Sequence, residues 1–197
     1  MPLPASEWTV LLLGGASGVG KSMLSHRLAR RLGVNLTEVD DFQIALETAT
    51  TPEDLPLLHF WRTNFGEYAS WTDERRVEHH IAVCREVFLP VMRAVIADHL
   101  ETATRVVFEG DFLLPEMATD GDERNEPRVQ ALFVSEPDEA QIAANFMVRE
   151  GRAQPERART SWLFDGFLRA ECDGRGVPIV DARPWESVVE RALAALA

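Results

Sequence analysis

Eight consecutive residues near the start of the chain have the types and spacing of a phosphate-binding loop. The segment GASGVGKS, residues 15–22, fits the pattern G-x-x-x-x-G-K-[ST], and Lys21 is the only lysine among 197 residues. Glycines permit backbone conformations that turn consecutive N–H groups toward one anion. Lys21 would bring a mobile positive charge to the β- and γ-phosphates, and the Ser22 hydroxyl is placed to bind Mg²⁺. We expect nucleotide contacts from Gly15, Ala16, Ser17, Gly18, Val19, Gly20, Lys21 and Ser22, with Lys21 also catalytic.

The sequence around this loop has the order that phosphate binding requires. Residues 8–13 form a short apolar run typical of a buried parallel strand. After the loop, Leu24, Leu28 and Leu32 recur every four residues, which predicts a helix packed on a sheet. A helix that begins near Lys21 would add the positive end of its dipole to the site. We expect the Lys21 side chain to face solvent when no nucleotide is bound.

Carboxylates follow the second predicted strand. Residues 34–40 alternate apolar and polar side chains and end in the pair Asp40 and Asp41. A carboxylate at the end of this strand would face the γ-phosphate, so Asp40 could orient an acceptor hydroxyl or take its proton. The alternative is that one of the pair caps the following helix, a role that we expect Asp41 to fill more readily. Asp41 is also a weaker candidate for contact with the substrate.

A second acidic group follows the third predicted strand, residues 105–108. This strand runs into Glu109 and Asp111. In a parallel sheet, ligands bind beyond the carboxyl ends of the strands, so both carboxylates should share a cleft with the phosphate loop. Glu109 could hold Mg²⁺, through a bound water, or an acceptor hydroxyl, and Asp111 could contact the substrate. The alternative for Glu109 is a solvated strand end.

Four arginines lie close together later in the chain, at positions 149, 152, 157 and 159. The planar guanidinium suits phosphate oxygens and the charge of a phosphoryl-transfer transition state. We take Arg152 as the first candidate for a catalytic arginine. The alternative is an exposed helix face on which these arginines pair with Glu150 and Glu156.

Residues 48–72 are rich in threonine, proline and aromatic side chains, and they predict an irregular or partly helical insertion on the acceptor side. Binding residues often lie in such segments, so His59, Trp61 and Arg62 could recognise the acceptor. The alternative is that the aromatic residues anchor the insertion to the core.

Length and composition point to one domain spanning residues 1–197. An apolar fraction of 46% is enough for a buried core, and a net charge of −12 without a cluster of cations argues against nucleic acid as a partner. Cys84 and Cys172 lack metal-ligand spacing and fit free thiols in a reducing compartment. The start of the chain has no basic region and no apolar run long enough for a signal or membrane segment, so we expect a cytoplasmic location and no membrane contact. The oligomeric state stays open.

Predicted strands alternate with predicted helices along the chain. This alternation predicts an α/β fold with a five-stranded parallel sheet flanked by helices. Further expectations are a long helix from Thr72 that is kinked at Pro90, a solvated loop over 117–127, a fourth strand over 129–134, a helix after Ser135, a fifth strand over 177–180 and a closing helix over 188–196.

Two segments resemble small P-loop kinases of the nucleoside-monophosphate-kinase type. Residues 14–22 and the segment EGDFLLP at 109–115 are similar to the phosphate loop and the E-G-x-x-L-x-P motif of 2-phosphoglycerate kinase-like proteins. Asp40 stands where that group, and the similar chloramphenicol phosphotransferases and uridine kinases, keep an acceptor-side aspartate. Residues 149–159 resemble their mobile lid, which implies a lid over 149–160 in this chain, and residues 176–180 resemble their last strand. The resemblance implies ATP and Mg²⁺ as cofactors and a γ-phosphoryl transfer to a hydroxyl group.

The acceptor stays open between several small molecules. A 2-phosphoglycerate-like compound, a nucleoside, a sugar or an antibiotic are all candidates, and a neutral or cationic hydroxyl compound fits the acidic chain at least as well as an anion. The alternative function is an ATP-binding regulatory domain or an ATPase without a small-molecule acceptor. A GTPase of the common type is disfavoured, because its N-K-x-D motif needs a second lysine.

Overall fold

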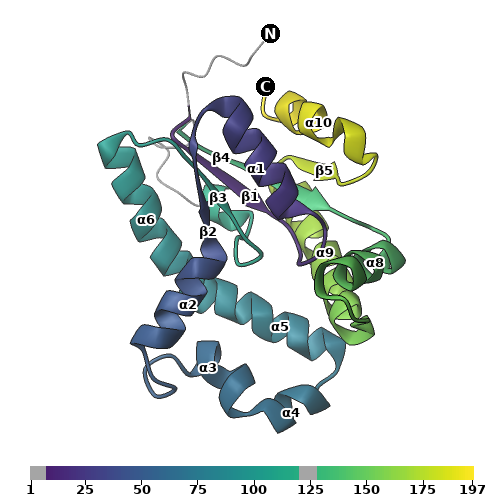
Figure 1. The fold of residues 1–197 in the computed structure, drawn as a ribbon. Helices are drawn as coiled ribbons and strands as arrows, with labels where there is room; N and C mark the ends of the chain where they lie inside the picture. The colour runs from purple at the N-terminus through teal and green to yellow at the C-terminus, as the bar shows by residue number, and fades with distance from the viewer. Residues whose placement is uncertain (1–7, 120–127) are drawn as a thin grey trace.

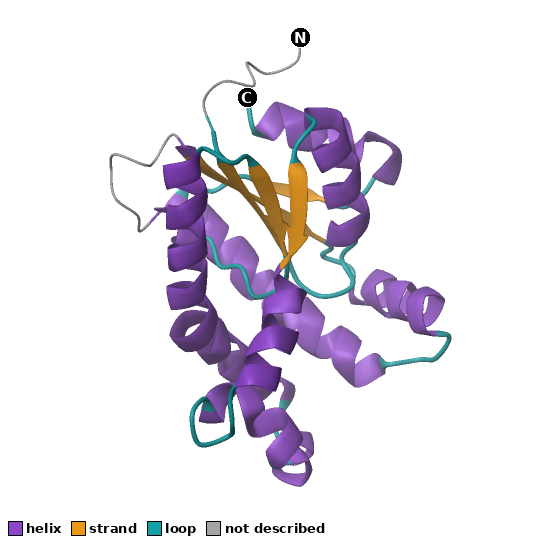
Figure 2. Cartoon of the chain, turned by 60° about the vertical axis from the view of Figure 1, so that its left-hand side comes forward, coloured by secondary structure: helices purple, strands orange, loops and turns teal. Residues whose placement is uncertain are grey.

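A five-stranded parallel sheet with helices on both faces forms the body of the molecule (Figures 1 and 2). The computed structural model describes residues 8–119 and 128–197. The strand order is β2-β3-β1-β4-β5 and every pairing is parallel, which confirms the predicted α/β architecture. Most of the predicted loop over 117–127 lies outside the described residues, and its first residues belong to the short helix α7, Glu116–Thr119.

The central strand β1, Val10–Gly14, is buried along its whole length between β3, Val106–Glu109, and β4, Val129–Ser135. Burial on both faces explains why these strands are continuous apolar runs in the sequence. The edge strands are β2, Asn35–Glu38, and β5, Ile179–Asp181. Leu13 pairs with Glu109, so the carboxyl end of β3 lies beside the start of the phosphate loop.

Two groups of helices cover the two faces of the sheet. Helices α1, Lys21–Leu32, and α10, Val188–Ala195, contact each other on one face. Helices α6, Leu89–Thr102, and α9, Pro155–Arg175, contact β1 and β4 respectively, with α7 packed between them. These layers place the carboxyl ends of the strands at one open edge.

A third group of helices lies beyond that edge (Figure 1). It contains α2, Val39–Ala49, α3, Pro56–Thr63, α4, Phe65–Ser70, and α5, Asp73–Val83. The segment predicted as a partly helical insertion therefore consists of the end of α2, the two short helices and their connections. Thr72 caps α5, since its side chain accepts a hydrogen bond from the Arg75 N–H.

Helix α5 continues into α6 through one turn of π-helix, η1, Cys84–Phe88. Pro90 follows directly, in the first turn of α6. Proline has no N–H group and its ring clashes with the carbonyl four residues back, so a wider turn before it relieves the conflict. Figure 1 shows α5 and α6 running in different directions, as the predicted kink requires.

Several element boundaries differ from the sequence-based expectation. Strand β2 ends at Glu38, and Asp40 and Asp41 lie in the first turn of α2 rather than at the end of the strand. The chain turns here because Val39 is completely buried and packs on Gly110, where an added Cβ would lie 2.8 Å from the Val39 Cβ. Glu38 occupies the N-cap position, so the expectation that Asp41 caps this helix was wrong.

The remaining differences are small. Strand β1 begins at Val10 rather than Trp8, and β3 extends to include Glu109. Strand β5 was expected over 177–180 and instead runs from Ile179 to Asp181. Asp138 caps α8, Glu139–Glu150, with a hydrogen bond from Ala140 N–H. Cys84 and Cys172 are free and buried, as expected. Within the two described stretches, no helix combines the length and the apolar character needed to cross a bilayer.

Candidate active site

The phosphate loop joins β1 to α1 and has the backbone geometry of an anion site. Gly15, Gly18 and Gly20 have φ angles of 143°, 83° and 101°, which residues with a Cβ rarely adopt. At Gly15 a Cβ would also lie 2.4 Å from the Val134 carbonyl oxygen. No side chain caps the N-terminus of α1 at Gly20, so the first turn offers its N–H groups to a ligand.

Lys21 folds back over the loop rather than into solvent. Its side chain is 8% exposed, and the Nζ atom donates a hydrogen bond to the Ala16 carbonyl at 3.0 Å and lies 4.0 Å from Glu109 Oε1. The expectation of a solvent-facing lysine was therefore wrong. The Ala16 carbonyl and the Glu109 carboxylate contact the Lys21 ammonium where phosphate oxygens would otherwise bind it. A buried charge needs such compensating partners.

Glu109 and Ser22 lie together beside this ammonium. Burial raises the pKa of Glu109 above its ordinary value, while the charge of Lys21 and a hydrogen bond from Ser22 lower it. The Ser22 hydroxyl is exposed to solvent. These two oxygen ligands suit Mg²⁺, which proteins often hold through one or two side chains together with substrate phosphates. Within residues 8–119 and 128–197, no set of three His, Cys, Asp or Glu side chains forms a metal site by itself.

Asp40, in the first turn of α2, interacts electrostatically with Lys21 and Glu109. Partial burial in the cleft and then the charge of Asp111 raise the pKa of Asp40 to about 6, and Lys21 acts in the opposite direction. The side chain is nevertheless open to solvent, as a group that meets a substrate must be. Asp111 itself is half-buried, and its carbonyl oxygen lies 3.0 Å from the His80 Nε2 atom. The structure thus brings Lys21, Asp40, Glu109 and Asp111 into one electrostatic cluster.

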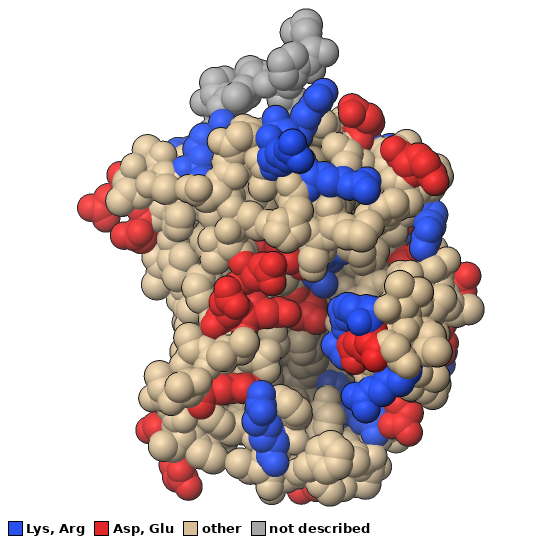
Figure 3. All heavy atoms as spheres, in the orientation of Figure 1, with Lys and Arg blue, Asp and Glu red and all other residues tan. Residues whose placement is uncertain are grey.

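Figure 3 shows the surface of the molecule in the orientation of Figure 1. Acidic side chains gather near its centre, above a hollow, and several basic side chains line the other side of that hollow.

Asp41 is exposed next to Asp40, borders none of the cavities described below, and stays an untested candidate for substrate contact.

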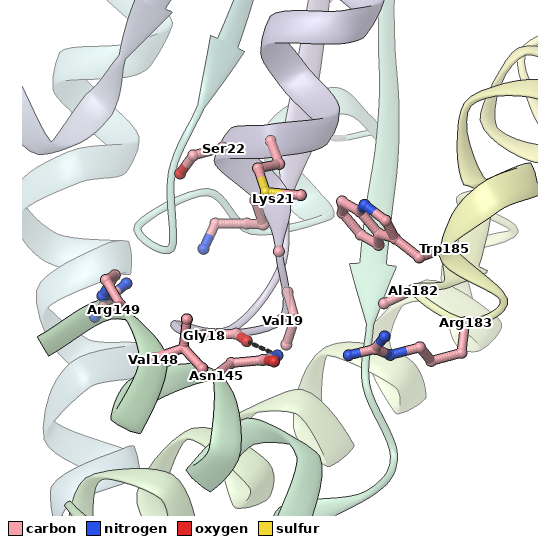
Figure 4. Close-up of a pocket in the computed structure, with 12 residues that line it drawn as sticks. Gly18, Val19, Lys21, Ser22, Asn145, Val148, Arg149, Ala182, Arg183 and Trp185 are labelled. Atoms are coloured by element: carbon pink, nitrogen blue, oxygen red, sulfur yellow. Dashed lines mark hydrogen bonds between the residues drawn. The ribbon is translucent and has the colours of Figure 1, made fainter. Parts of the chain in front are cut away.

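A cavity of about 440 Å³ adjoins the phosphate loop. Residues from the loop and α1 form one side, α8 contributes a second, and the segment after β5 contributes a third (Figure 4). Arg149 and Arg183 approach it from opposite sides, and Asn145 fastens α8 to the loop by donating a hydrogen bond to the Gly18 carbonyl at 2.8 Å. The size is within the range of roughly 300–1,000 Å³ that is typical of ligand pockets.

Several of these residues escaped the sequence analysis. Asn145, Arg183 and Trp185 belong to no recognisable motif, and only the fold brings them to the phosphate loop. The Trp185 ring packs so closely on Gly20 that an added Cβ there would lie 2.9 Å from it. Trp185 comes from η3, Trp185–Ser187, far from the loop in the sequence, so no local signal could have indicated this contact.

The predicted lid consists of the end of α8, a turn over 151–154 and the start of α9. Arg149 and Arg157 both bind Glu150, at 2.8 and 2.6 Å, and both lie over the Phe146 ring. Arg157 also donates a hydrogen bond to Ser17 Oγ at 3.3 Å, so one arginine of the predicted cluster already contacts the phosphate loop. Arg152 is exposed in the turn, outside the lining of the 440 Å³ cavity, and its catalytic role is untested.

The residues of the predicted insertion over 48–72 divide between the two alternatives, a role in recognition and a role in anchoring the segment. His59 is buried, and its Nε2 atom lies 3.0 Å from Thr50 Oγ1, which indicates a structural role. Arg62 is paired with Glu47 at 2.8 Å and stacks over Trp61, with its guanidinium carbon 4.3 Å from the ring centre. Trp61 borders two cavities near the cleft.

Comparison with known proteins supports the resemblance seen in the sequence. No protein-family model matches the chain. A 2-phosphoglycerate kinase from Methanococcus maripaludis strain C5 is 27% identical over 118 residues, which cover 54% of this chain and 36% of that protein. Another, from Pyrococcus horikoshii, is 43% identical over 51 residues, covering 25% of this chain and 17% of that protein. The aligned parts therefore span only a minority of the length of these relatives.

Solved structures share the fold over nearly the whole chain. A gluconokinase from Sinorhizobium meliloti 1021 has a TM-score of 0.57 and 22% identity, covering 95% of this chain and 90% of that one. A sugar kinase from Janibacter sp. HTCC2649 has a TM-score of 0.56 and 22% identity, covering 96% and 94%. The chain is thus a distant relative of 2-phosphoglycerate kinases and has the fold of the small P-loop kinases, as the sequence predicted.

Proposed function

We propose that the chain is an ATP-dependent phosphotransferase that moves the γ-phosphoryl group of ATP to a hydroxyl group of a small molecule. The observation that carries this proposal is the convergence of a phosphate loop, its lysine and the Asp40 carboxylate in one cleft. Phosphoryl transfer needs charge stabilisation on the transferring group and an oriented nucleophile, and these residue types supply both. The distant 2-phosphoglycerate kinases and the kinases with the same fold are consistent with this class of reaction.

Each residue of the cleft has a role in this proposal. The loop N–H groups and Lys21 hold the phosphates, and Lys21 exchanges its contacts with Ala16 and Glu109 for phosphate oxygens. Ser22 and Glu109 are the candidates to hold Mg²⁺, which when bound neutralises charge on the β- and γ-phosphates. Asp40 aligns the acceptor hydroxyl and takes its proton as the hydroxyl oxygen bonds to the γ-phosphorus and the bond to ADP breaks.

Arginines complete the site from the lid side. Arg149 lines the cavity next to the phosphate loop, and Arg157 reaches Ser17 within it. We assign the nucleotide to this cavity, with Trp185 and Arg183 on the far side from the lid. Arg152 stays a further candidate for stabilising the transition state, in which case the turn over 151–154 moves toward the phosphates when they bind.

The proposal is tested by ADP release from Mg²⁺·ATP in the presence of a broad set of small alcohols. We expect the rate to rise with an acceptor, and ³¹P NMR should detect a new phosphate ester. The Lys21→Met variant sets the background, because it keeps the aliphatic stem and removes the charge. ADP formation that is independent of every alcohol, yet depends on Lys21, would instead identify an ATPase or a regulatory ATP-binding domain.

A further inference from the structure

A small cavity without charged side chains lies on the acceptor side of the cleft. Its volume is about 190 Å³, and it is bounded by α2 to α5 and by the segment after β3. Pockets for drug-sized ligands are larger, roughly 300–1,000 Å³, so this cavity has room for about one ring. The lining residues are Gln43, Leu58, Trp61, Tyr68, His79, His80, Val83 and Phe112.

This cavity adjoins the group proposed to activate the acceptor. Gln43 lies three residues after Asp40 on α2, and side chains at that spacing share one face of a helix. Phe112 directly follows Asp111 and lines the cavity, and the neighbouring His80 ring contacts the Asp111 carbonyl. The cavity is thus bordered by the same face of α2 that carries Asp40 and by the residue that follows Asp111.

Aromatic rings form much of the wall. Trp61 and Tyr68 border this cavity and also a second one, of about 380 Å³, which extends to Arg157 at the start of α9. The Trp71 ring, 5.3 Å from that of Tyr68, stacks on Phe60 at 4.9 Å and supports the wall from behind. Flat aromatic faces bind the apolar face of a ring while leaving its hydroxyl groups free.

Burial favours the uncharged forms of two side chains that line the cavity, His79 and Tyr68. Burial, followed by the nearby His80, lowers the pKa of His79, which favours the neutral imidazole. Burial raises the pKa of Tyr68, so this side chain stays a phenol. These two side chains therefore offer hydrogen bonds without adding a charge.

The arginines nearest to the cavity are already compensated. Glu47 binds Arg62, and the same carboxylate accepts hydrogen bonds from Gln43 at 2.9 Å and from Trp61 Nε1 at 3.3 Å. The Glu47 side chain is only 9% exposed, while that of Arg62 is 56% exposed, so the carboxylate is the buried partner of this pair. Glu47 thus neutralises the cation beside the cavity and positions two of the side chains that line it.

The same holds for every arginine of the acceptor side. Residues 39–89 contain ten acidic residues and four arginines. All four arginines pair with a carboxylate: Arg62 with Glu47, Arg75 with Glu67, Arg76 with Asp73, and Arg85 with Glu116. An acidic acceptor entering here would meet Asp40 and Asp111 without a free arginine from this segment, and burying an unpaired anion is costly.

From this aromatic cavity, which is lined by no arginine, lysine, aspartate or glutamate and lies next to an acidic centre, we infer that the phosphoryl acceptor is a small ring-bearing alcohol that carries neither a carboxylate nor a phosphate group. The inference rests on the proposed phosphotransferase function. This acceptor class differs from that of kinases whose acceptors carry a phosphate or a carboxylate group. Such acceptors bring a negative charge, which needs an unpaired cation in the site. The ring lies against Trp61 and Tyr68, and its hydroxyl group points toward Asp40.

The first experiment compares two panels of acceptors in the ADP-release assay. One panel contains nucleosides, hexoses and inositols, and the other contains 2-phosphoglycerate, gluconate, shikimate and sugar phosphates. We expect the best neutral alcohol to exceed every anion at least tenfold in kcat/KM, with Lys21→Met as background. An anion that equals or exceeds the best neutral alcohol overturns the inference but leaves the phosphotransferase intact. No Lys21-dependent stimulation by either panel contradicts the phosphotransferase itself.

The second experiment tests the aromatic wall with the best acceptor. Trp61→Ala should raise KM for the acceptor at least tenfold without changing KM for ATP, and Trp61→Phe should restore most of the loss because it keeps an aromatic face. Ile44→Ala is the matched control, since Ile44 is 62% exposed on α2 and lies outside the lining of this cavity. Equal KM values for Trp61→Ala and the control would overturn the assignment of this cavity.

Discussion

The ammonium of Lys21 lies 4.0 Å from the Glu109 carboxylate, so a buried pair joins the start of α1 to the end of β3. A buried lysine held by an acid and a carbonyl is already positioned before any phosphate arrives. The same pair means that substitution of Lys21 affects the resting structure as well as the reaction, because Ala16 and Glu109 lose their partner.

We expect Lys21→Met to lower kcat/KM for ATP turnover by about 10²–10³, the usual cost of removing a group that stabilises transition-state charge. The free energy of unfolding should fall by about 1–3 kcal/mol, because the Ala16 carbonyl loses its side-chain donor and the buried Glu109 loses the cation beside it. Steady-state kinetics and urea denaturation measure the two effects. Unchanged kinetics would remove Lys21 from the reaction.

Asp40→Asn should reduce kcat far more than it changes the affinity for ATP. In the free protein the Asp40 pKa is raised to about 6, so a base at this position loses activity as the pH falls through 6. The pH profile of kcat/KM should therefore show an acidic limb near pH 6 that Asp40→Asn abolishes. Asp165 also has a pKa of about 6, so Asp165→Asn is the control and should keep the limb.

Asp165 should make stability depend on pH in the opposite sense from an acid whose pKa is lowered by folding. Burial raises its pKa from 3.8 to about 6, against the hydrogen bond from Ser135 and the charge of Arg169. Between about pH 4 and 6 the folded state binds more protons than the unfolded state, so the free energy of unfolding declines as the pH rises. Above pH 6 the penalty is complete.

The difference in unfolding free energy between Asp165→Asn and the wild type should accordingly shift in favour of the variant from pH 4 to 6 and then level off. Asp181→Asn serves as a control, since Asp181 binds the same Arg169 from a more exposed position. Guanidinium denaturation at several pH values gives both curves. A constant difference for Asp165→Asn across this range would contradict the assignment.

Two Gly→Ala substitutions should have opposite effects on stability. At Gly20 the φ angle is 101° and the added Cβ would press on Trp185, so Gly20→Ala should cost about 1–3 kcal/mol and weaken nucleotide binding. Gly166 is exposed inside α9 with no atom near the added Cβ, so Gly166→Ala should stabilise by roughly 0.5–1 kcal/mol. Thermal denaturation with and without an ATP analogue separates the two outcomes.

The sequence predicted the central part of the fold because local patterns reflect long-range burial there. The buried strands are apolar runs, and the helix after the phosphate loop has its apolar residues at helical spacing. The sequence predicted the ends of strands and helices less well where the burial of a single residue decides them. Val39 is the example, since its packing on Gly110 ends β2 two residues early and places Asp40 on a helix.

The residues of the candidate site were predicted where a local pattern marks them and missed where their role depends on a distant partner. The phosphate loop, Asp40, Glu109 and Asp111 follow from motif and strand position, and the structure brings them together. The burial of Lys21 was missed because its partner Glu109 comes from a different strand. Glu47 was also missed, since an acid on an amphipathic helix gives no sign that it will compensate Arg62 and hold Trp61.

The amino-acid sequence by itself determined the phosphate-binding loop, the order of strands and helices and the acidic ends of two strands, because all of these are encoded in neighbouring residues. Only the tertiary structure decided which arginines are free, which aromatic rings face a cavity and which side chains meet the loop from α8 and from the segment after β5. Those properties depend on distances between residues far apart in the chain, and these distances are fixed only when the sheet and its helices pack.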